Sequence, residues 1–431
     1  MKKQLLIFCM AFSLVSQAQN QVLTGYWHNW NDASAPYLAL NEIDSQYDII
    51  CISFIVPENG TTYQMAFSPE SATPSEFAAD IQLLQSQDKK VLFSIGGATA
   101  PVHVSSEQEK SVFVNTILDI IQTYQPDGLD IDFEGASLSV SGGTISEPVD
   151  QSVLLIIDAF REIMESFHQT YGRKMMLTAA PETAFVQGGQ SAYGGIWGAY
   201  LPVLDALRDS LDYLQVQLYN SGSMYGIDGN VYVQGTTDFI LSQTEALISG
   251  FNTSGGAFEG FPQEKICIGL PACPMAAGGG FISADSLEAA VNYLIGNGPQ
   301  PGSYSLQNAG SYPAIGGLMT WSINWDATPG CNATYEFANT YSQIFELSTA
   351  TRDYNASEIA LFPVPADDFL YLKTNGISSK KVQFSLFDSS GKLLKSIQVL
   401  NSGNMFRIET GNLSSGLYFI QSELGTQKFT K

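Results

Sequence analysis

The most unusual stretch of the sequence is DGLDIDFE, residues 127–134, in which carboxylate side chains recur at short intervals. It holds four acidic residues: Asp127, Asp130, Asp132 and Glu134. From residue 129 onward apolar and acidic residues alternate, so in a β-strand the last three carboxylates would share one face. A buried row of carboxylates suffers repulsion and desolvation, and a fold tolerates it mainly where it does chemistry. A solvated edge strand is the alternative, but the apolar flanks favour a buried parallel strand.

Short apolar strands and amphipathic helices alternate from Val22 to Glu346. We expect strands at residues 22–27, 48–55, 90–97, 129–134, 174–180, 213–220, 265–272 and 316–325. We expect helices around residues 77–84, 114–121, 149–171, 236–249, 285–295 and 334–346. This order predicts an α/β fold, a (β/α)8 TIM barrel. A doubly wound open sheet is the alternative, but no Gly-rich phosphate-binding turn follows the first strand.

Aromatic residues gather where the strands of such a barrel end, which is where its active site lies. Trp27 and Trp30 follow the first strand, Tyr219 ends the sixth, and Trp321 and Trp325 belong to the eighth. The first and eighth strands are neighbours in a closed barrel, and sugar rings stack on aromatic faces. We therefore expect a saccharide cleft, although one or two of the four tryptophans are equally well explained by packing between strands and helices.

Charge and composition exclude several classes of protein. The chain is 45% hydrophobic and 14% charged, which indicates a globular protein with a large core. Its net charge is −23, and residues 4–350 hold 35 acidic side chains against eight basic ones. Such a surface repels nucleic acid and anionic lipid and suits a neutral ligand. The three histidines lack metal-ligand spacing, so we expect no metal and no cofactor.

The N-terminus, residues 1–18, reads as a secretory signal peptide. Two lysines precede an apolar run that ends in Ser16-Gln17-Ala18, and the run is too short to span a membrane. A buried N-terminal helix is the alternative. No other apolar run approaches the length of a membrane helix, so we expect a secreted protein without a membrane span.

Four cysteines remain after export. Cys51 and Cys267 lie in strand-like runs and are expected to be buried thiols. Cys273 and Cys331 lie in loops after the seventh and eighth strands, which are adjacent at one face of the barrel. Because the compartment is oxidising, we expect a disulfide between them, with two free thiols as the alternative.

The acidic stretch resembles the DGxDxDxE signature of glycoside hydrolase family 18, the chitinase family. Four more segments resemble motifs of that family in the same order: SIGG (94–97), LTAAPE (177–182), QVQLYN (215–220) and MTWSINWD (319–326). The resemblance covers essentially residues 20–346 and implies a catalytic barrel at residues 19–348. It implies a chitinase that hydrolyses β-1,4 bonds between N-acetylglucosamine units with retention of configuration.

The resemblance also implies a role for each member of the acidic row. In this family the carbonyl oxygen of the substrate's own 2-acetamido group attacks the anomeric carbon, so one protein acid suffices. Glu134 would be the general acid and base, and Asp132 would bind the acetamido N–H. Asp130 would share a proton with Asp132 and tune its charge. Tyr219 would position the acetamido carbonyl, and crowding of carboxylates should raise the pKa of Glu134.

Substrate contacts follow from the same resemblance. Trp321 would form the floor under the sugar that is cleaved. Gln217 and Asn220, which stand where some members have Met and Asp, and also Tyr26 and Trp27 are further expected contacts. About twelve residues separate the seventh strand from the next helix, too few for the module that deepens the cleft in some members. We therefore predict an open groove and endo-type cleavage of chitin or chito-oligosaccharides. We also expect the protein to be a monomer. Asp127 precedes the alternating run and is expected to have a structural role.

Residues 349–356 form an expected linker, and residues 357–431 change to short alternating strands. They predict a small all-β sandwich. LFPVPADDFLYL and LSSGLYFI resemble the C-terminal sorting domain of type IX secretion, which implies export through that machinery. A carbohydrate-binding module is the alternative, but the segment contains no tryptophan.

Two rival functions remain open at this point. An endo-β-N-acetylglucosaminidase that acts on N-glycans shares the acidic motif, so substrate tests must separate it from a chitinase. A non-catalytic chitin-binding lectin on the same barrel typically lacks the acid at the last motif position, where this chain has Glu134.

Overall fold

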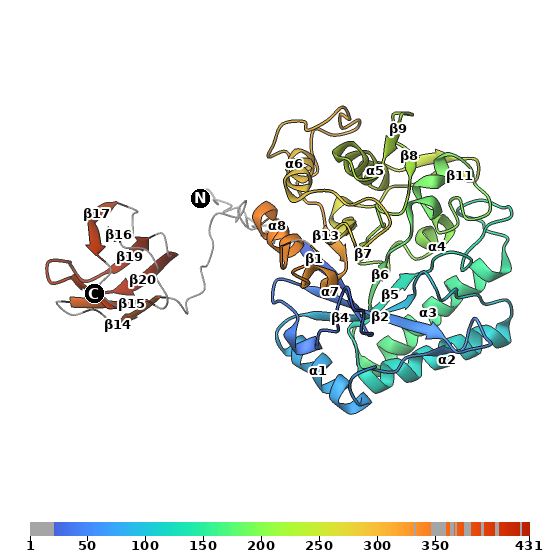
Figure 1. Cartoon of the computed structure of the whole chain (residues 1–431), viewed down its shortest axis with the longest axis horizontal. Helices are drawn as coiled ribbons and strands as arrows, with labels where there is room; N and C mark the ends of the chain where they lie inside the picture. Colours follow the sequence, from blue (N-terminus) through green and yellow to red (C-terminus); the bar gives the residue numbers. More distant parts are fainter. Residues whose placement is uncertain are drawn as a thin grey trace, which may run out of the picture. The chain divides into compact units, whose positions relative to one another are not determined.

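The computed structural model describes residues 21–345 except 332, and residues 359–431 apart from 363–365, 367–368, 375–380, 389–391, 401–404 and 423–424. The expected signal peptide and linker lie outside the described residues. The chain divides into two compact units between Phe345 and Glu346 (Figure 1). No described helix is both long and apolar enough to cross a membrane.

The first unit is a barrel of parallel strands surrounded by helices, which confirms the predicted α/β fold (Figure 1). Its barrel strands are β1 (Val22–His28), β2 (Ile49–Pro57), β4 (Lys90–Gly96), β5 (Gly128–Asp132), β6 (Met176–Ala179), β7 (Tyr213–Leu214), β12 (Cys267–Pro271) and β13 (Gly317–Trp321). The sheet order runs from β12 through β13 and β1 to β7. Single parallel bridges from Leu214 to Ile266 and from Gln217 to Gly269 close the barrel.

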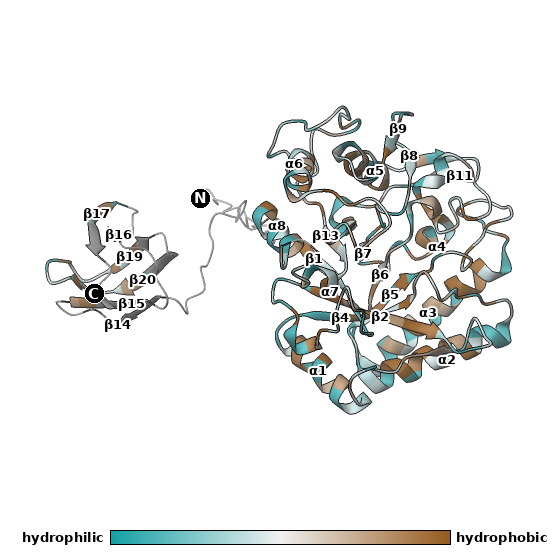
Figure 2. Ribbon diagram, in the orientation of Figure 1, coloured by the Kyte–Doolittle hydropathy of each residue, from teal (hydrophilic) through white to brown (hydrophobic). Residues whose placement is uncertain are grey.

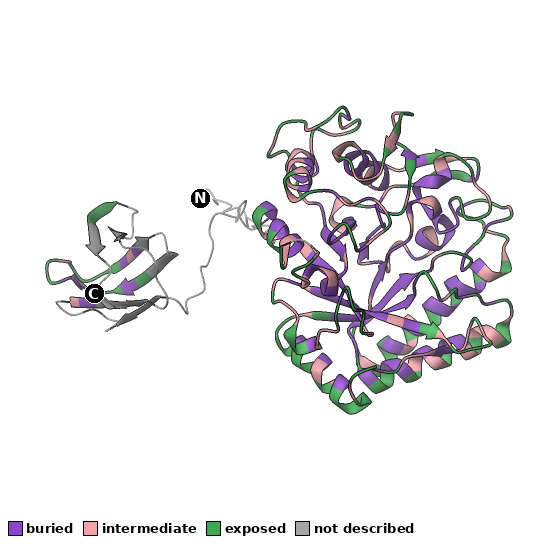
Figure 3. Cartoon of the chain, viewed as in Figure 1, coloured by how far each residue is buried: buried purple, intermediate pink, exposed green. Residues whose placement is uncertain are grey.

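Helices cover the outside of the strands. They are α1 (Pro74–Ser86), α2 (Glu107–Tyr124), α3 (Gln151–Tyr171), α4 (Leu201–Ala206), α5 (Thr237–Ser249), α6 (Ala284–Ile295), α7 (Ile323–Asp326) and α8 (Glu336–Phe345). Figure 2 shows hydrophobic and hydrophilic residues alternating along α1, α2 and α3, as expected for helices with one face on a core. Figure 3 shows that the strands are buried and that exposed residues lie on the outer parts of these helices.

Two predicted strands end several residues earlier than expected. The sixth ends at Leu214, because the following residues are held by single bridges rather than by a continuous ladder. The eighth ends at Trp321, because the Ser322 hydroxyl accepts the N–H of Trp325 and begins the short helix α7. Hairpins β8 (Ser223–Tyr225) with β9 (Val231–Val233) and β10 (Phe251–Thr253) with β11 (Gly256–Phe258), together with the two-residue strand β3 (Met65–Ala66) beside β2, complete the unit.

The second unit consists of two antiparallel sheets, as predicted for a small all-β domain. The sheet orders are β14-β15-β18 and β17-β16-β19-β20. The strands are β14 (Ile359–Phe362), β15 (Phe369–Thr374), β16 (Lys381–Asp388), β17 (Leu393–Leu400), β18 (Met405–Glu409), β19 (Leu417–Ser422) and β20 (Gly425–Thr430).

Candidate active site

Strand β5 directs its acidic residues into the barrel and its apolar residues toward the helices, as the alternation predicted. Leu129, Ile131 and Phe133 belong to the large core cluster between strands and helices, whereas Asp130 and Asp132 are buried on the other face. The end of β5 is held in place by Tyr200, whose hydroxyl bonds to the N–H of Phe133 at 2.7 Å and to the carbonyl of Ile131 at 3.2 Å. Glu134 follows directly and is half-buried.

Asp130 is fully buried and surrounded by hydroxyl groups. Tyr26 and Ser94 each donate to Oδ2 at 2.7 Å, and Thr178 donates to Oδ1 at 2.5 Å. Burial raises the pKa of Asp130, and these hydrogen bonds oppose the rise by stabilising the charged form. Asp130 in turn helps to raise the pKa of Asp132 through its charge, which supports the predicted tuning role.

Asp132 is coupled to Glu134 more closely than to Asp130. A hydrogen bond joins the side chains of Asp132 and Glu134. Burial, the charge of Glu134 and the charge of Asp130 raise the pKa of Asp132 well above its ordinary range. The sequence interpretation had Asp132 share a proton with Asp130, but the three hydroxyl donors already occupy Asp130, and the contact that holds a proton lies between Asp132 and Glu134.

Gln217 binds both carboxylates. Its Nε2 lies 2.9 Å from Asp132 Oδ1, 3.2 Å from Glu134 Oε1 and 2.9 Å from the carbonyl oxygen of Ala180. The pKa of Glu134 is raised, in the predicted direction, but the main cause is burial and the second raising influence is the charge of Glu182. The hydrogen bonds from Gln217 and Asp132 lower the pKa of Glu134. Crowding within the acidic row, which was the expected cause, is therefore not what raises this pKa.

A cleft of about 500 Å³ opens above this group of carboxylates. Asp132, Glu134 and Gln217 line it together with Tyr219, Asn220 and an aromatic wall formed by Trp30, Phe54 and Trp321. Phe54 and Trp321 stack with 5.8 Å between their ring centroids and 12° between their planes. At the base of the cleft, Gly96 has a φ of +112°, and a Cβ there would lie 2.4 Å from the carbonyl oxygen of Asp132. A glycine is therefore required where β4 and β5 approach each other.

Two of the predicted substrate contacts are placed differently. Trp27 is fully buried, donates its indole N–H to the carbonyl of Leu38 at 2.8 Å and packs on Phe77 of α1, so its prediction as a substrate contact is wrong. In strand β1 it points outward, toward the helices. Tyr26 points inward and lines the cleft, but its hydroxyl is committed to Asp130 and supports that carboxylate.

A larger hollow, of about 730 Å³, lies at the opposite ends of the strands. Its lining contains two aspartates that form ion pairs. Asp127 pairs with Lys90 at 3.7 Å, and Asp212 pairs with Lys174 at 2.6 Å. Each of these carboxylates also accepts a backbone N–H of a neighbouring strand. They therefore stabilise the strand ends, in agreement with the structural role predicted for Asp127, and the aromatic cleft is the better candidate for the active site.

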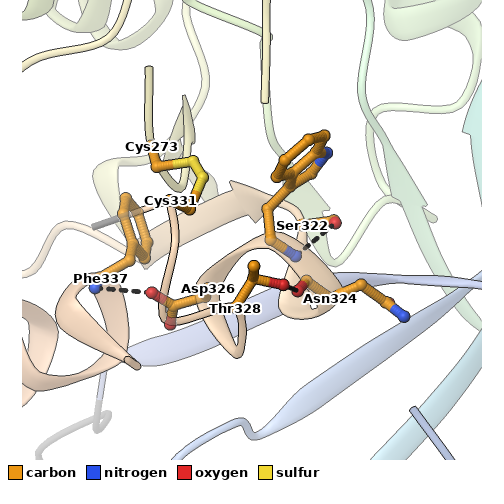
Figure 4. The surroundings of a disulfide bond; sticks show 8 residues. Cys273, Ser322, Asn324, Asp326, Thr328, Cys331 and Phe337 are labelled. Atoms are coloured by element: carbon orange, nitrogen blue, oxygen red, sulfur yellow. Dashed lines mark hydrogen bonds between the residues drawn. A yellow bond between two sulfur atoms is a disulfide. The ribbon is translucent and has the colours of Figure 1, made fainter. Parts of the chain in front are cut away.

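A disulfide joins Cys273 and Cys331, the pair expected from the sequence, with 5.7 Å between their Cα atoms (Figure 4). Cys273 follows β12, and Cys331 follows α7. Asp326 lies beside the bond and accepts the N–H of Phe337 at 2.9 Å. The disulfide thus ties two loops together next to the segment that carries Trp321.

Sequence reasoning missed four residues of this site: Phe54, Ser94, Thr178 and Glu182. Ser94 and Thr178 occupy inward positions of predicted strands, so period-two alternation could have assigned them to the barrel interior. Phe54 lies where the register of β2 with β4 shifts, and Glu182 lies beyond the end of β6, so local patterning gives no direction for either side chain. Within the described residues, no group of three His, Cys, Asp or Glu side chains is arranged to hold a metal ion.

Comparisons with known proteins show the family to which the chain belongs. The family model described as glycosyl hydrolases family 18 matches residues 22–297, and that of the secretion system C-terminal sorting domain matches residues 360–431. Chitinase Chi52 of Paenibacillus xylanexedens is 44% identical over 310 residues, which cover 71% of this chain and 58% of that protein. Chitinase ChiA of Flavobacterium johnsoniae is 32% identical over 427 residues, 93% of this chain and 26% of that protein.

A comparison with solved structures gives the same family. A family 18 chitinase from Chromobacterium violaceum aligns with a TM-score of 0.67 and 31% identity, over 76% of this chain and 83% of that one. The chain spans little more than half the length of chitinase Chi52.

Proposed function

Because the chain belongs to family 18 of the glycosyl hydrolases, we propose that its barrel is a chitinase that cleaves β-1,4 bonds between N-acetylglucosamine units. The observation that carries this proposal is the coupled pair Asp132–Glu134, bridged by Gln217 at the floor of an aromatic cleft. The C-terminal sorting domain marks the chain as an exported protein, extracellular or at the cell surface. Its partners would be the polysaccharide and the type IX secretion machinery.

The arrangement of carboxylates favours assistance by the substrate over a mechanism with two protein carboxylates. Such mechanisms place the two groups about 5 to 9.5 Å apart, on opposite sides of the sugar. Here Asp132 is hydrogen-bonded to Glu134 on the same side. The third carboxylate among the described lining residues, Glu70, is exposed and lies in the loop between β3 and α1.

We infer the following sequence of steps. The carbonyl oxygen of the 2-acetamido group attacks the anomeric carbon while Glu134 gives its proton to the departing glycosidic oxygen. The bond between these two atoms breaks, and a cyclic oxazolinium ion forms. Asp132 accepts the acetamido N–H and stabilises the positive charge, and the Tyr219 hydroxyl donates to the acetamido oxygen. Water then attacks the same face that the leaving group occupied, and the Glu134 carboxylate takes its proton.

The loop between β12 and α6 bears on the mode of cleavage. Twelve residues, 272–283, connect the two elements. With no module inserted there, the cleft is expected to be an open groove that accepts a chain in its middle. This supports endo-type cleavage.

The proposal is tested by incubating the full chain with N-acetylglucosamine hexamer, colloidal chitin and a glycoprotein that carries N-glycans. We expect the hexamer to give dimer, trimer and tetramer together from the earliest times, and the glycoprotein to remain intact. Release of glycans without cleavage of the hexamer would favour the endo-β-N-acetylglucosaminidase. Dimer alone would contradict the open groove, and binding without cleavage would indicate a lectin.

A further inference from the structure

Glu182 is a half-buried carboxylate next to the proposed acid, and the mechanism above gives it no role. It lies three residues after the end of β6 and precedes a short 3₁₀ turn, Thr183–Phe185. A residue in this position commonly caps the turn with its side chain, but Glu182 makes no such hydrogen bond. Its carboxylate instead accepts the backbone N–H of Gly135, the residue after Glu134.

The backbone of Glu182 is also joined to the segment that carries Gln217. It forms a parallel bridge with Gln217, and the N–H of Gln217 donates to the carbonyl of Pro181 at 2.9 Å. Gln217 in turn bonds to Glu134 through its side chain. Glu182 therefore contacts the catalytic segment through two separate connections, one through Gly135 and one through Gln217.

The ionisable groups that face Glu134 are acidic or neutral. They are Asp132 on β5, Glu182 after β6 and Tyr219 beyond β7, with Asp130 one step deeper on β5. The described lining of the cleft contains no lysine or arginine. A negative charge at Glu182 therefore acts on Glu134 without a basic neighbour to offset it.

We propose, on the basis of the function proposed above, that Glu182 is a positioning residue that orients the Glu134–Gly135 peptide and keeps the proton on Glu134 before the substrate is cleaved. A negative charge nearby disfavours the carboxylate form of an acid. Consistent with this, burial is the main cause of the raised pKa of Glu134, and the charge of Glu182 adds to it. After cleavage the same charge makes Glu134 a stronger base toward water.

Two substitutions separate the charge of Glu182 from its hydrogen bond. In Glu182→Gln the amide oxygen can still accept the N–H of Gly135, but the charge is gone. In Glu182→Ala both are lost. Glu147→Gln is the matched control, since Glu147 is an exposed carboxylate in the loop after β5, on the same face of the barrel. For each variant, kcat/KM on the hexamer is measured across pH, and folding is checked by thermal melting.

We expect the alkaline fall of kcat/KM to move to lower pH in Glu182→Gln, so that the ratio of activity at about pH 8 to that on the acidic plateau drops roughly threefold to tenfold. The plateau should stay within about threefold of wild type. Glu182→Ala should show the same shift and a plateau about tenfold lower, and Glu147→Gln should match wild type. An unmoved profile in folded Glu182→Gln overturns the inference. Failure of the wild type to cleave the hexamer would instead overturn the proposed function.

Discussion

Glu134→Gln is expected to lower kcat on the N-acetylglucosamine hexamer by about a thousandfold, because the amide can neither donate a proton to the leaving oxygen nor accept one from water. The amide has nearly the same shape as the acid, and its oxygen can still accept the Gln217 side chain. We therefore expect an unchanged dissociation constant for the hexamer and, because the raised pKa of Glu134 costs the wild type stability at neutral pH, a melting temperature no lower than that of the wild type. Steady-state kinetics and calorimetry of binding give the three quantities.

The pH dependence of the wild type belongs to the same prediction. Because burial raises the pKa of Glu134, the acid remains protonated above the range of an exposed glutamate. Activity should fall as pH rises through that pKa, since the leaving oxygen then lacks a proton donor. Glu147→Gln again serves as the control. If Glu134→Gln kept more than about a tenth of wild-type kcat, the acid would have to be another residue.

Asp132→Asn is expected to lower kcat by about a hundredfold to a thousandfold, because a neutral amide stabilises the positively charged intermediate far less than a carboxylate does. The hydrogen-bonding partners, Glu134 and Gln217, are retained in this variant. The loss should therefore appear in kcat more than in KM. A loss confined to KM would mean that Asp132 binds the substrate equally in the ground state and the transition state.

The same substitution should stabilise the fold at neutral pH. The folded pKa of Asp132 is raised, so below the ordinary pKa of an aspartate both the folded and unfolded states hold the proton, and no penalty exists. As pH rises toward the folded pKa, the unfolded state is stabilised by losing that proton, and the wild type becomes less stable. Asparagine has no such proton. Thermal melting should thus show Asp132→Asn above wild type at about pH 7, with the difference vanishing near about pH 3.

The strand positions could be predicted because short apolar runs alternate with amphipathic helices, and the inward direction of the carboxylates because the acidic strand carries a pattern of period two. Residues 129–133 alternate strictly, and their direction in the barrel follows from that pattern alone. The fold class followed in the same way from the order of strands and helices. The disulfide could be predicted because both loops follow adjacent strands.

Side-chain directions in uniformly apolar strands, and at positions beyond strand ends, could not be predicted in the same way. Trp27 and Tyr26 are neighbours in β1, and the one that faces the cleft depends on the register of the strand, which a run of apolar residues such as VLTGYW leaves open. The proton-sharing partner of Asp132 depends on a side-chain rotamer. The influence of Glu182 on Glu134 requires the adjacency of β5 and β6 and a half-buried side chain, and neither has a local sequence signal.

The central claim, that the substrate's acetamido group is the nucleophile, is tested most directly by changing that group alone. Chito-oligosaccharide aryl glycosides with acetyl, fluoroacetyl, difluoroacetyl and trifluoroacetyl groups on the 2-amino nitrogen of the reacting sugar form a series of falling carbonyl nucleophilicity. We predict that kcat/KM falls steadily along the series, by about a hundredfold or more in total, because the attacking oxygen carries less charge. Equal values across the series would contradict the account and require a nucleophile supplied by the protein.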